Sequence, residues 1–429
     1  MFFPAISLLL GLSALCLLKR YRNRSSVPPG PRGYPIIGNI FDMPPAATLS
    51  QGLGAMSSKF GDIIYLTIFS QPLLALNSQK VAFELLGTKG DSSAGRPHAV
   101  MASELSGYDR FMAMMQSSDR LRDARKYLQR AVGPQHAKNY AAAQQEQVVR
   151  FLKKLAEEPD KFEEHSKWIV GAATLIIAYG YHTQDIDDPY IAALSTVLDQ
   201  FAIAAAPGKW LVDFLPILKY LPSWFPGTQY KKLATYFRAH ALTSSRMPYD
   251  AVKEQMRKGV MNRSLIASFL EETPNPTQDE EEFMMFLMAD LYGGGLHSMT
   301  SLMTSFFLAM IMNQPAQMKA QAEIDAVCNL HSRLPTFTDK SSLPYVEALV
   351  LEVLRWGAPI PLGIPHRFTT DEVYQGHTIP KGTHAFANIG AIAFDPSSYP
   401  EPELFRPERF LGPNPQLDPR KTVFGFGRR

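Results

Sequence analysis

The chain ends on VFGFGRR, in which two glycines alternate with two phenylalanines and two arginines follow. Glycine permits a tight turn, phenylalanine offers a flat apolar surface, and arginine binds anions through a planar set of donors. The segment therefore predicts a loop that holds a flat, anionic ligand.

A second candidate lies in VEALVLEVLRWG, where Glu352 and Arg355 stand three residues apart and so share one face of a helix. An exposed pair of this kind would contribute only a few tenths of a kcal/mol. Here apolar residues surround the pair, which indicates burial, and a buried pair needs a further partner. Arg409, in the proline-stiffened segment FRPERF, is the candidate for that partner.

The third feature is a run of three glycines, 293–295, inside a predicted helix over 278–312. Thr277 and Glu280 have the spacing of a capping box at its start. Each glycine costs a helix about 1 kcal/mol relative to alanine, so roughly 3 kcal/mol must be offset elsewhere. Two explanations stay open: close approach of a flat molecule, or tight packing against another helix.

Taken in order, these motifs resemble those of the cytochrome P450 family of haem-thiolate monooxygenases. The proline cluster at 28–31, the glycine-broken helix, Glu352-x-x-Arg355, PERF and FGFGRR all occur in the family's order. The likeness runs from the amino terminus to the last residue and is greatest to membrane-bound fungal members. It implies an EC 1.14-type oxidoreductase that uses haem b.

The family's haem-binding loop reads Phe-x-x-Gly-x-Arg-x-Cys, which Phe424, Gly427 and Arg429 match. Its axial cysteine would lie two positions beyond the last residue. Neither Cys16 nor Cys328 is placed to replace that thiolate, so the sequence implies no metal ligand within the chain and no haem bound in the thiolate form. The resemblance also implies that the family's C-terminal part is missing.

By resemblance, the haem propionates would be held by Arg125, His366 and Arg429. Leu121 stands where the family usually has tryptophan, so one propionate hydrogen bond is lost. Without the resemblance, Arg125 reads as surface charge on a basic helix. That basic stretch is also a candidate contact for an acidic NADPH-cytochrome P450 reductase.

In the family, the glycine-broken helix carries an acid and an alcohol that relay protons during oxygen activation. Alignment of LYGGGLHSMTS places Gly294 and Gly295 over the haem, His297 at the acid and Ser298 at the alcohol. Histidine can shuttle protons and serine keeps the hydroxyl. The alternative for His297 is an ordinary core residue, and Asp290 is expected to be structural.

A hydrophobic small molecule is the expected substrate, because apolar residues follow the buried helix at 358–364 and occur near Met112 and Met115. The alternative for each is a place in the core. The predicted pocket residues are Phe111, Leu296, Ile360, Leu362 and Ile364.

Helical periodicity dominates the chain, so the predicted fold is mainly α with a small β-rich lobe, the cytochrome P450 fold. Strands are expected within 61–77 and 364–390. Helices are expected over 136–158, 164–181, 228–258, 278–312, 315–328 and 343–356. A net charge of +3 and the absence of a long basic run exclude a nucleic-acid partner.

The apolar run FFPAISLLLGLSALCLL, followed at once by KRYRNR, predicts a transmembrane anchor over 1–24. Charges after the run place the body in the cytosol, as in a single-pass protein of the endoplasmic reticulum. A cleaved signal sequence is the alternative. A proline-rich hinge, 25–34, then leads to a catalytic domain, 35–429, and the segment 221–227 is a second candidate membrane contact.

The resulting hypothesis is a membrane-anchored enzyme that oxidises a terpenoid, polyketide or aromatic compound of secondary metabolism, or a xenobiotic, with O2 and reductase-delivered electrons. Departures at Leu121, His297 and Met299 leave two alternatives open. One is a non-catalytic P450 remnant, and the other is a gene fragment.

Overall fold

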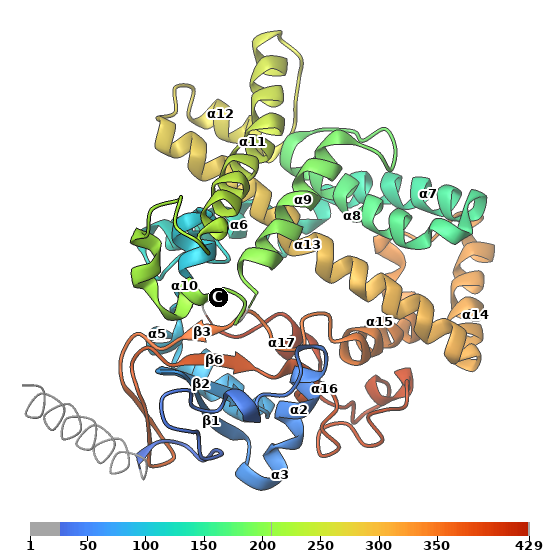
Figure 1. Ribbon diagram of the computed structural model, residues 1–429. Coiled ribbons are helices and arrows are strands. Elements are labelled where there is room, and N and C mark those ends of the chain that lie inside the picture. The colour runs from blue at the N-terminus through green and yellow to red at the C-terminus, as the bar shows by residue number, and fades with distance from the viewer. Residues whose placement is uncertain (1–25, 207, 428–429) are drawn as a thin grey trace, which may run out of the picture. The chain divides into compact units, whose positions relative to one another are not determined.

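The computed structural model describes residues 26–206 and 208–427, so the predicted anchor over 1–24 lies outside the described residues. The chain divides into two compact units (Figure 1). The strand-rich unit comprises the described parts of 1–95, 361–392 and 425–429. The helical unit comprises 96–360 and 393–424. The mainly α architecture with a small β-rich part is confirmed, and the single catalytic domain over 35–429 stays a prediction.

The strand-rich unit is built on a four-stranded sheet in the order β1-β2-β6-β3. β1 (Ile63–Ile68) and β2 (Gln71–Leu76) form an antiparallel hairpin, in which Ile63 pairs with Leu76. β6 (His384–Ala387) runs parallel to β2, and β3 (His366–Arg367) pairs antiparallel with β6. β4 (Glu372–Tyr374) and β5 (His377–Ile379) form a separate hairpin. Both predicted strand regions are confirmed.

Short helices complete this unit. They are α2 (Leu49–Ala55), α3 (Ser57–Phe60), α4 (Gln79–Ala82), a π-helix over Phe83–Thr88, α5 (Gly90–Ser93) and α16 (Ile389–Ala393). A small core joins the sheet to α2 through Leu53, Ile64 and Leu66. Beside it, the buried Asn388 amide donates to Asn77 Oδ1 and to the Ser50 carbonyl, which ties the end of β6 to β2 and α2.

The helical unit is organised around α13 (Gln278–Met312), whose bounds match the predicted helix. The capping box of Thr277 and Glu280 is present, with both reciprocal hydrogen bonds made. α13 is the one described helix that is long and apolar enough to cross a membrane, but its residues from Met284 to Leu296 contribute to the core of this unit. We therefore assign it to the globular body.

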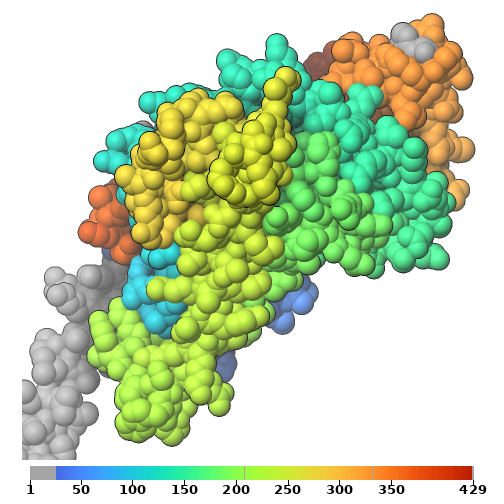
Figure 2. Space-filling model, turned by 90° about the horizontal axis from the view of Figure 1, so that it is seen from above, coloured from blue at the N-terminus to red at the C-terminus, as the bar shows by residue number. Residues whose placement is uncertain are grey.

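The remaining helices of this unit include the other predicted helical segments, each within a few residues (Figure 1). They are α6 (Asp119–Val132), α7 (Ala141–Glu157), α8 (Phe162–Tyr179), α9 (Pro189–Ala204), α10 (Leu211–Phe214), α11 (Gln229–Arg257), α12 (Leu265–Glu272), α14 (Gln314–His331), α15 (Pro344–Gly357) and α17 (Arg420–Val423). α11 covers much of the face shown in Figure 2.

Four of these helices, α9, α10, α12 and α17, were not predicted from the periodicity. α9 is apolar on nearly all sides because it packs against α11, α13 and α8, so it lacks a polar stripe. Its start is nevertheless well specified, since the Asp188 carboxylate accepts hydrogen bonds from the Tyr190 and Ile191 amides and Pro189 follows the cap.

Candidate active site

The Glu352 carboxylate is the centre of a buried ion cluster in the helical unit. Arg355, one turn later on α15, donates from Nε and Nη2 to its two oxygens, both at 2.8 Å. Arg409 donates from Nε at 3.0 Å, and the Arg406 backbone amide donates at 2.8 Å. The side chains of Glu352, Arg355 and Arg409 are all 0% exposed.

Carbonyl oxygens satisfy the remaining guanidinium donors of this cluster. Arg355 Nη1 donates to the Ala393 carbonyl at 2.8 Å, and Arg409 donates to the Leu404 carbonyl and to Gln416 Oε1. Burial lowers the pKa of Arg409, while the Glu352 carboxylate opposes that shift. The cluster therefore fastens the loop after α16 to α15, which makes it a structural element of the helical unit.

The three glycines of α13 have different surroundings, so both explanations left open by the sequence apply. A Cβ on Gly293 would lie 2.7 Å from Leu198 Cδ2 of α9, so this glycine permits close helix packing. A Cβ on Gly295 would make ordinary contacts with Val170 of α8. At Gly294, no described atom lies within 4 Å of the Cβ position, so the helix presents an open face there.

His297 and Ser298 lie one turn beyond Gly294, on the same side of α13. The His297 side chain is 56% exposed, and its Nε2 lies 3.8 Å from Asp199 Oδ1 of α9. Ser298 Oγ donates to the Gly294 carbonyl at 2.8 Å and also lies 3.3 Å from the Gly295 carbonyl. The predicted catalytic residues are thus brought together, although His297 is paired across helices and is no core residue.

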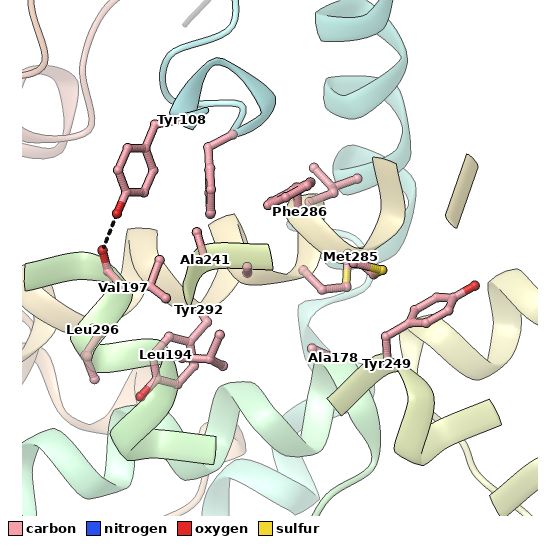
Figure 3. Packing of buried hydrophobic residues seen from close by; sticks show 14 of the residues in the cluster. Tyr108, Ala178, Leu194, Val197, Ala241, Tyr249, Met285, Phe286, Tyr292 and Leu296 are labelled. Carbon is pink, nitrogen blue, oxygen red and sulfur yellow. Dashed lines mark hydrogen bonds between the residues drawn. The ribbon is translucent and has the colours of Figure 1, made fainter. Parts of the chain in front are cut away.

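The segment before α6 packs against α13 and carries the first predicted pocket residue. The Phe111 ring meets the Phe286 ring edge-to-face at 5.0 Å, and Tyr108 Oη donates to the Val197 carbonyl of α9 (Figure 3). The Asp290 carboxylate accepts a hydrogen bond from the Met112 amide, and burial raises its pKa to about 7. Asp290 therefore acts as a structural fastener for this segment.

The other predicted pocket residues are distributed over both units. Leu296 is buried in the core of the helical unit, where Figure 3 shows it beside Tyr292 and Leu194. Ile360, after α15, is 41% exposed. In the strand-rich unit Ile364 is also 41% exposed, and Leu362 packs on the small core of the sheet. A common pocket for these five residues stays a prediction.

Arg125 lies on α6, where the buried Leu121 packs one turn earlier. Its side chain is half-buried, and it has no hydrogen-bond or ion-pair partner among the described residues. Neighbouring Arg120 differs, because it forms an ion pair with Asp279 at 2.8 Å. A half-buried guanidinium without an anion is one that a ligand carboxylate would satisfy.

In the strand-rich unit, His366 is buried and its Nδ1 lies 3.0 Å from the Ser93 carbonyl, which fixes the ring orientation. In the same unit, the C-terminal loop packs against the π-helix over Phe83–Thr88, which is far away in the sequence. Gly427 has a φ of +64°, and a Cβ there would lie 2.3 Å from the Leu86 carbonyl oxygen. Only glycine suits this position. The third predicted propionate ligand, Arg429, lies outside the described residues.

Phe424, the first residue of the predicted haem-binding loop, follows α17 and is 71% exposed. Phe426 differs and is buried. An aromatic ring this exposed offers a flat apolar surface of the kind a porphyrin would cover.

Each of these features suits part of a haem: the helical unit offers an unpartnered guanidinium, an exposed phenyl ring and an open helix face, and the strand-rich unit offers a fixed imidazole. No described cluster of three or more His, Cys, Asp or Glu residues could hold a metal ion. The one described cysteine, Cys328, is half-buried on α14. The described residues thus include side chains of the kinds that bind propionates and pack on a porphyrin.

The sequence did not lead us to predict a role for three residues of the helical unit, Asp199, Tyr108 and Arg406. Asp199 is the one acid within the otherwise uncharged α9, a signal that the sequence does contain. The role of Arg406 rests on its backbone amide, and Tyr108 donates to a backbone carbonyl. Hydrogen bonds that use a backbone amide or carbonyl do not depend on the type of that residue, so the sequence does not reveal them.

Comparison with known proteins agrees with these observations. A family model described as cytochrome P450 matches residues 28–429. Cytochrome P450 monooxygenase 208 of Postia placenta is 38% identical over 429 residues, which cover 99% of this chain and 83% of the relative. Cytochrome P450 monooxygenase claR of Ampulloclitocybe clavipes is 38% identical over 428 residues, covering 98% and 79%. Cytochrome P450 monooxygenase ppsD of Aspergillus oryzae is 36% identical over 438 residues, covering 99% and 82%.

The identity extends over nearly the whole chain, and the buried Glu352–Arg355–Arg409 cluster and glycine-broken α13 stand at the positions that the motifs predicted. This chain belongs to the cytochrome P450 family.

Proposed function

We propose that this chain is a haem-dependent monooxygenase that oxidises a hydrophobic small molecule with O2 and electrons from NADPH-cytochrome P450 reductase. The observation that carries the proposal is the open face of α13 at Gly294, flanked by His297 and Ser298, in a chain that belongs to this family. When bound, haem supplies the activation of dioxygen.

The residues of the chain would then have separate tasks. Arg125 and His366, with Arg429, hold the propionates through charge-assisted hydrogen bonds. Phe424 would offer an apolar surface to the porphyrin, and the open face at Gly294 would leave room for it and for substrate. His297 and Ser298 hold protons on the open side of α13.

The proposed substrate is a terpenoid, polyketide or aromatic compound of secondary metabolism, or a xenobiotic. Support comes from the apolar character of the segment packed on α13, where the rings of Tyr108, Phe111 and Phe286 contact one another. These rings exclude water and offer no charge that would select an ionic substrate.

The proposed location is the endoplasmic reticulum membrane, with an anchor over 1–24 and the body in the cytosol. A second observation supports a membrane contact: the segment 211–225 carries several exposed apolar side chains and lies at one end of the α11 face in Figure 2. Its most exposed members are Ile217, Tyr220 and Trp224, at 71%, 73% and 81%. Aromatic and aliphatic side chains of this kind suit the membrane interface.

The proposed reductase contact is α6. Arg122 is exposed and pairs only with Asp119 of its own helix, while Lys126 and Arg130 are exposed without a described partner. A cationic face of this kind favours association with an acidic protein and makes that association weaker at high salt.

The experiment is expression of the full chain in yeast microsomes with a fungal reductase, followed by a reduced carbon monoxide difference spectrum. Haem uptake, seen as a Soret band, together with product from a lipophilic substrate panel, supports the proposal, and the position of the band tests the expectation that residues 1–429 bind no haem in the thiolate form. Arg125→Ala should lower haem content severalfold, whereas Arg122→Ala, on the exposed side of α6, should leave it unchanged. Haem content equal in both variants would contradict the role of Arg125.

A second candidate function is a non-catalytic P450 scaffold that binds a lipid or partner. Two observations favour it: Ser298 Oγ is already engaged by backbone carbonyls, and Leu121 is a buried apolar residue that cannot donate to a propionate. In that case the chain would bind lipophilic compounds without a thiolate-type spectrum and without consuming NADPH.

A further inference from the structure

We propose that a groove between α6, α12 and the start of α13 is a second ligand site, which binds an aromatic carboxylate. The groove has a volume of about 480 Å³, and small-molecule sites usually have volumes of about 300–1,000 Å³. Met284, the lining residue farthest along α13, precedes Gly294 by about 15 Å of helix. The groove is therefore separate from the open face of α13, and the inference goes beyond the proposed function without depending on it.

The inner wall of the groove is apolar and largely aromatic. Met284 is buried there, and the half-buried rings of Tyr127, Phe269 and Phe283 line the same space. Aromatic rings pack well on a flat apolar molecule, and a methionine side chain adapts to the outline of its neighbour. This wall therefore favours a ligand with a flat aromatic body.

Hydrogen bonds and an ion pair hold the walls of the groove in place. Tyr127 Oη donates to the Leu265 carbonyl at 3.0 Å, which joins α6 to α12. Burial raises the pKa of Tyr127 to about 12, so its phenol stays neutral. Arg120 Nη1 donates to both carboxylate oxygens of Asp279, at 2.8 and 2.9 Å, and the guanidinium lies 5.2 Å from the centre of the Phe283 ring. Walls fixed in this way are preorganised for a ligand.

Two cations that line the groove have no such partner. Lys126 and Arg130 are exposed, and neither forms a hydrogen bond or ion pair with another described residue. They stand four residues apart on α6, where side chains of like charge lie close and repel one another. A carboxylate bound between them would relieve that repulsion, and the guanidinium of Arg130 can bind both of its oxygens.

Three acids also line the groove, and two of them are already engaged. Asp279 belongs to the ion pair just described, and Glu280 accepts the capping hydrogen bonds at the start of α13. Asp123, on α6, is exposed and forms no hydrogen bond or ion pair with another described residue. The charges without a partner are thus two cations and one acid. This balance favours a ligand with a single negative charge, and that charge would lie at the two cations.

The probe for this site is 4-benzoylbenzoate, an aromatic carboxylate that inserts into nearby C–H bonds on irradiation and reacts readily with methionine. The full chain in microsomes is irradiated with increasing concentrations of the probe, and the adducts are mapped by peptide mass spectrometry. We expect a saturable adduct on Met284 or Tyr127. The methyl ester of the probe has the same rings and no charge, so it should need a severalfold higher concentration for half-saturation.

Variants of exposed residues test the charges without disturbing the core. Lys126→Gln combined with Arg130→Gln should raise the half-saturating concentration of the acid severalfold and leave that of the ester unchanged, because each exposed charge changes affinity by about 1.4-fold to fivefold. Asp123→Asn should lower it for the acid, because this variant removes the unpartnered carboxylate. Arg122→Gln is the matched control, since Arg122 is an exposed cation of α6 that does not line the groove. Equal urea midpoints verify that the variants are folded.

Three results would overturn the proposal. The first is the lack of a saturable adduct on the residues that line the groove. The second is equal half-saturation by the acid and its ester, and the third is an effect of the double variant no larger than that of Arg122→Gln. No step of the test involves haem. Failure of the chain to bind haem or to oxidise a substrate, with the adducts as expected, would therefore count against the proposed function alone.

Discussion

Replacement of Glu352 by glutamine tests the buried ion cluster, because it removes one negative charge and keeps the shape of the side chain. The carboxylate accepts four hydrogen bonds, two from Arg355, one from Arg409 Nε and one from the Arg406 amide, at 2.8–3.0 Å. In the variant, two guanidinium groups would remain in a fully buried site without a counter-charge, and the amide nitrogen would face a donor.

Breaking a buried pair in this way costs about 3–5 kcal/mol, a large share of the 5–15 kcal/mol that stabilises a typical protein. We expect the urea midpoint of Glu352→Gln to fall accordingly. Trp356 fluorescence reports the event locally, since its indole Nε1 lies 3.3 Å from the Glu403 carbonyl and its ring meets Phe405 edge-to-face.

Glu401→Gln is the matched control, because Glu401 pairs with Arg406 at 2.7 Å on the surface, where such a pair is worth about 0–1 kcal/mol. A loss below about 1 kcal/mol in Glu352→Gln, equal to that in the control, would refute the view that the cluster fastens the loop to α15.

Three further predictions concern α13 and the membrane contact. Burial raises the pKa of Asp290 to about 7. Between about pH 4 and pH 7 the folded chain therefore holds a proton that the unfolded chain has lost. The free energy of unfolding should fall as pH rises across this range, by up to about 1.4 kcal/mol per pH unit. Asp290→Asn should flatten urea midpoints measured across that range, and an unchanged slope would contradict the assignment. Gly293→Ala should be less stable than Gly295→Ala by about 1–3 kcal/mol in thermal or urea unfolding. The new Cβ at position 293 would lie 2.7 Å from Leu198, whereas alanine at position 295 gains helix propensity at little steric cost. Equal stability of the two variants would show that α9 does not pack closely on α13 at Gly293. Brominated lipids should quench part of the tryptophan fluorescence of the membrane-bound chain, and Trp224→Phe should remove that part if segment 211–225 enters the interface.

Much of the helical unit follows from the sequence because its helices have one apolar and one polar side. α13 lacks this division into two sides and was predictable for another reason, since Thr277 and Glu280 specify its start by short-range hydrogen bonds. The strands were also predictable, because β1 and β2 form a local hairpin whose pairing needs no distant partner. The pairing of β6 with β2 joins residues about 310 positions apart, and nothing local in the sequence specifies it.

The buried ion cluster was predictable because a buried carboxylate needs cationic partners and the sequence offers few of them nearby. Glu352 and Arg355 share a helix face, and the apolar residues around them implied a third charge. The pairing of His297 with Asp199 was not predictable, because it depends on how closely α9 approaches α13. That distance is set by a missing side chain at Gly293 and by Leu198, a residue with no chemistry of its own.

Each of the three glycines therefore has its own explanation, because each has different surroundings. Together these explain why the helix tolerates the loss of helix propensity at all three positions. Gly293 brings α9 close, which places Asp199 beside His297. Gly294 leaves one face of α13 open, and its carbonyl accepts a hydrogen bond from the Ser298 hydroxyl. Gly295 makes only ordinary contacts at its Cβ position, with Val170 of α8, so the packing would accept alanine there as it would in the open space at Gly294. If a flat ligand alone required all three glycines, alanine at 293 and at 295 would be tolerated equally, whereas helix packing makes position 293 the restrictive one.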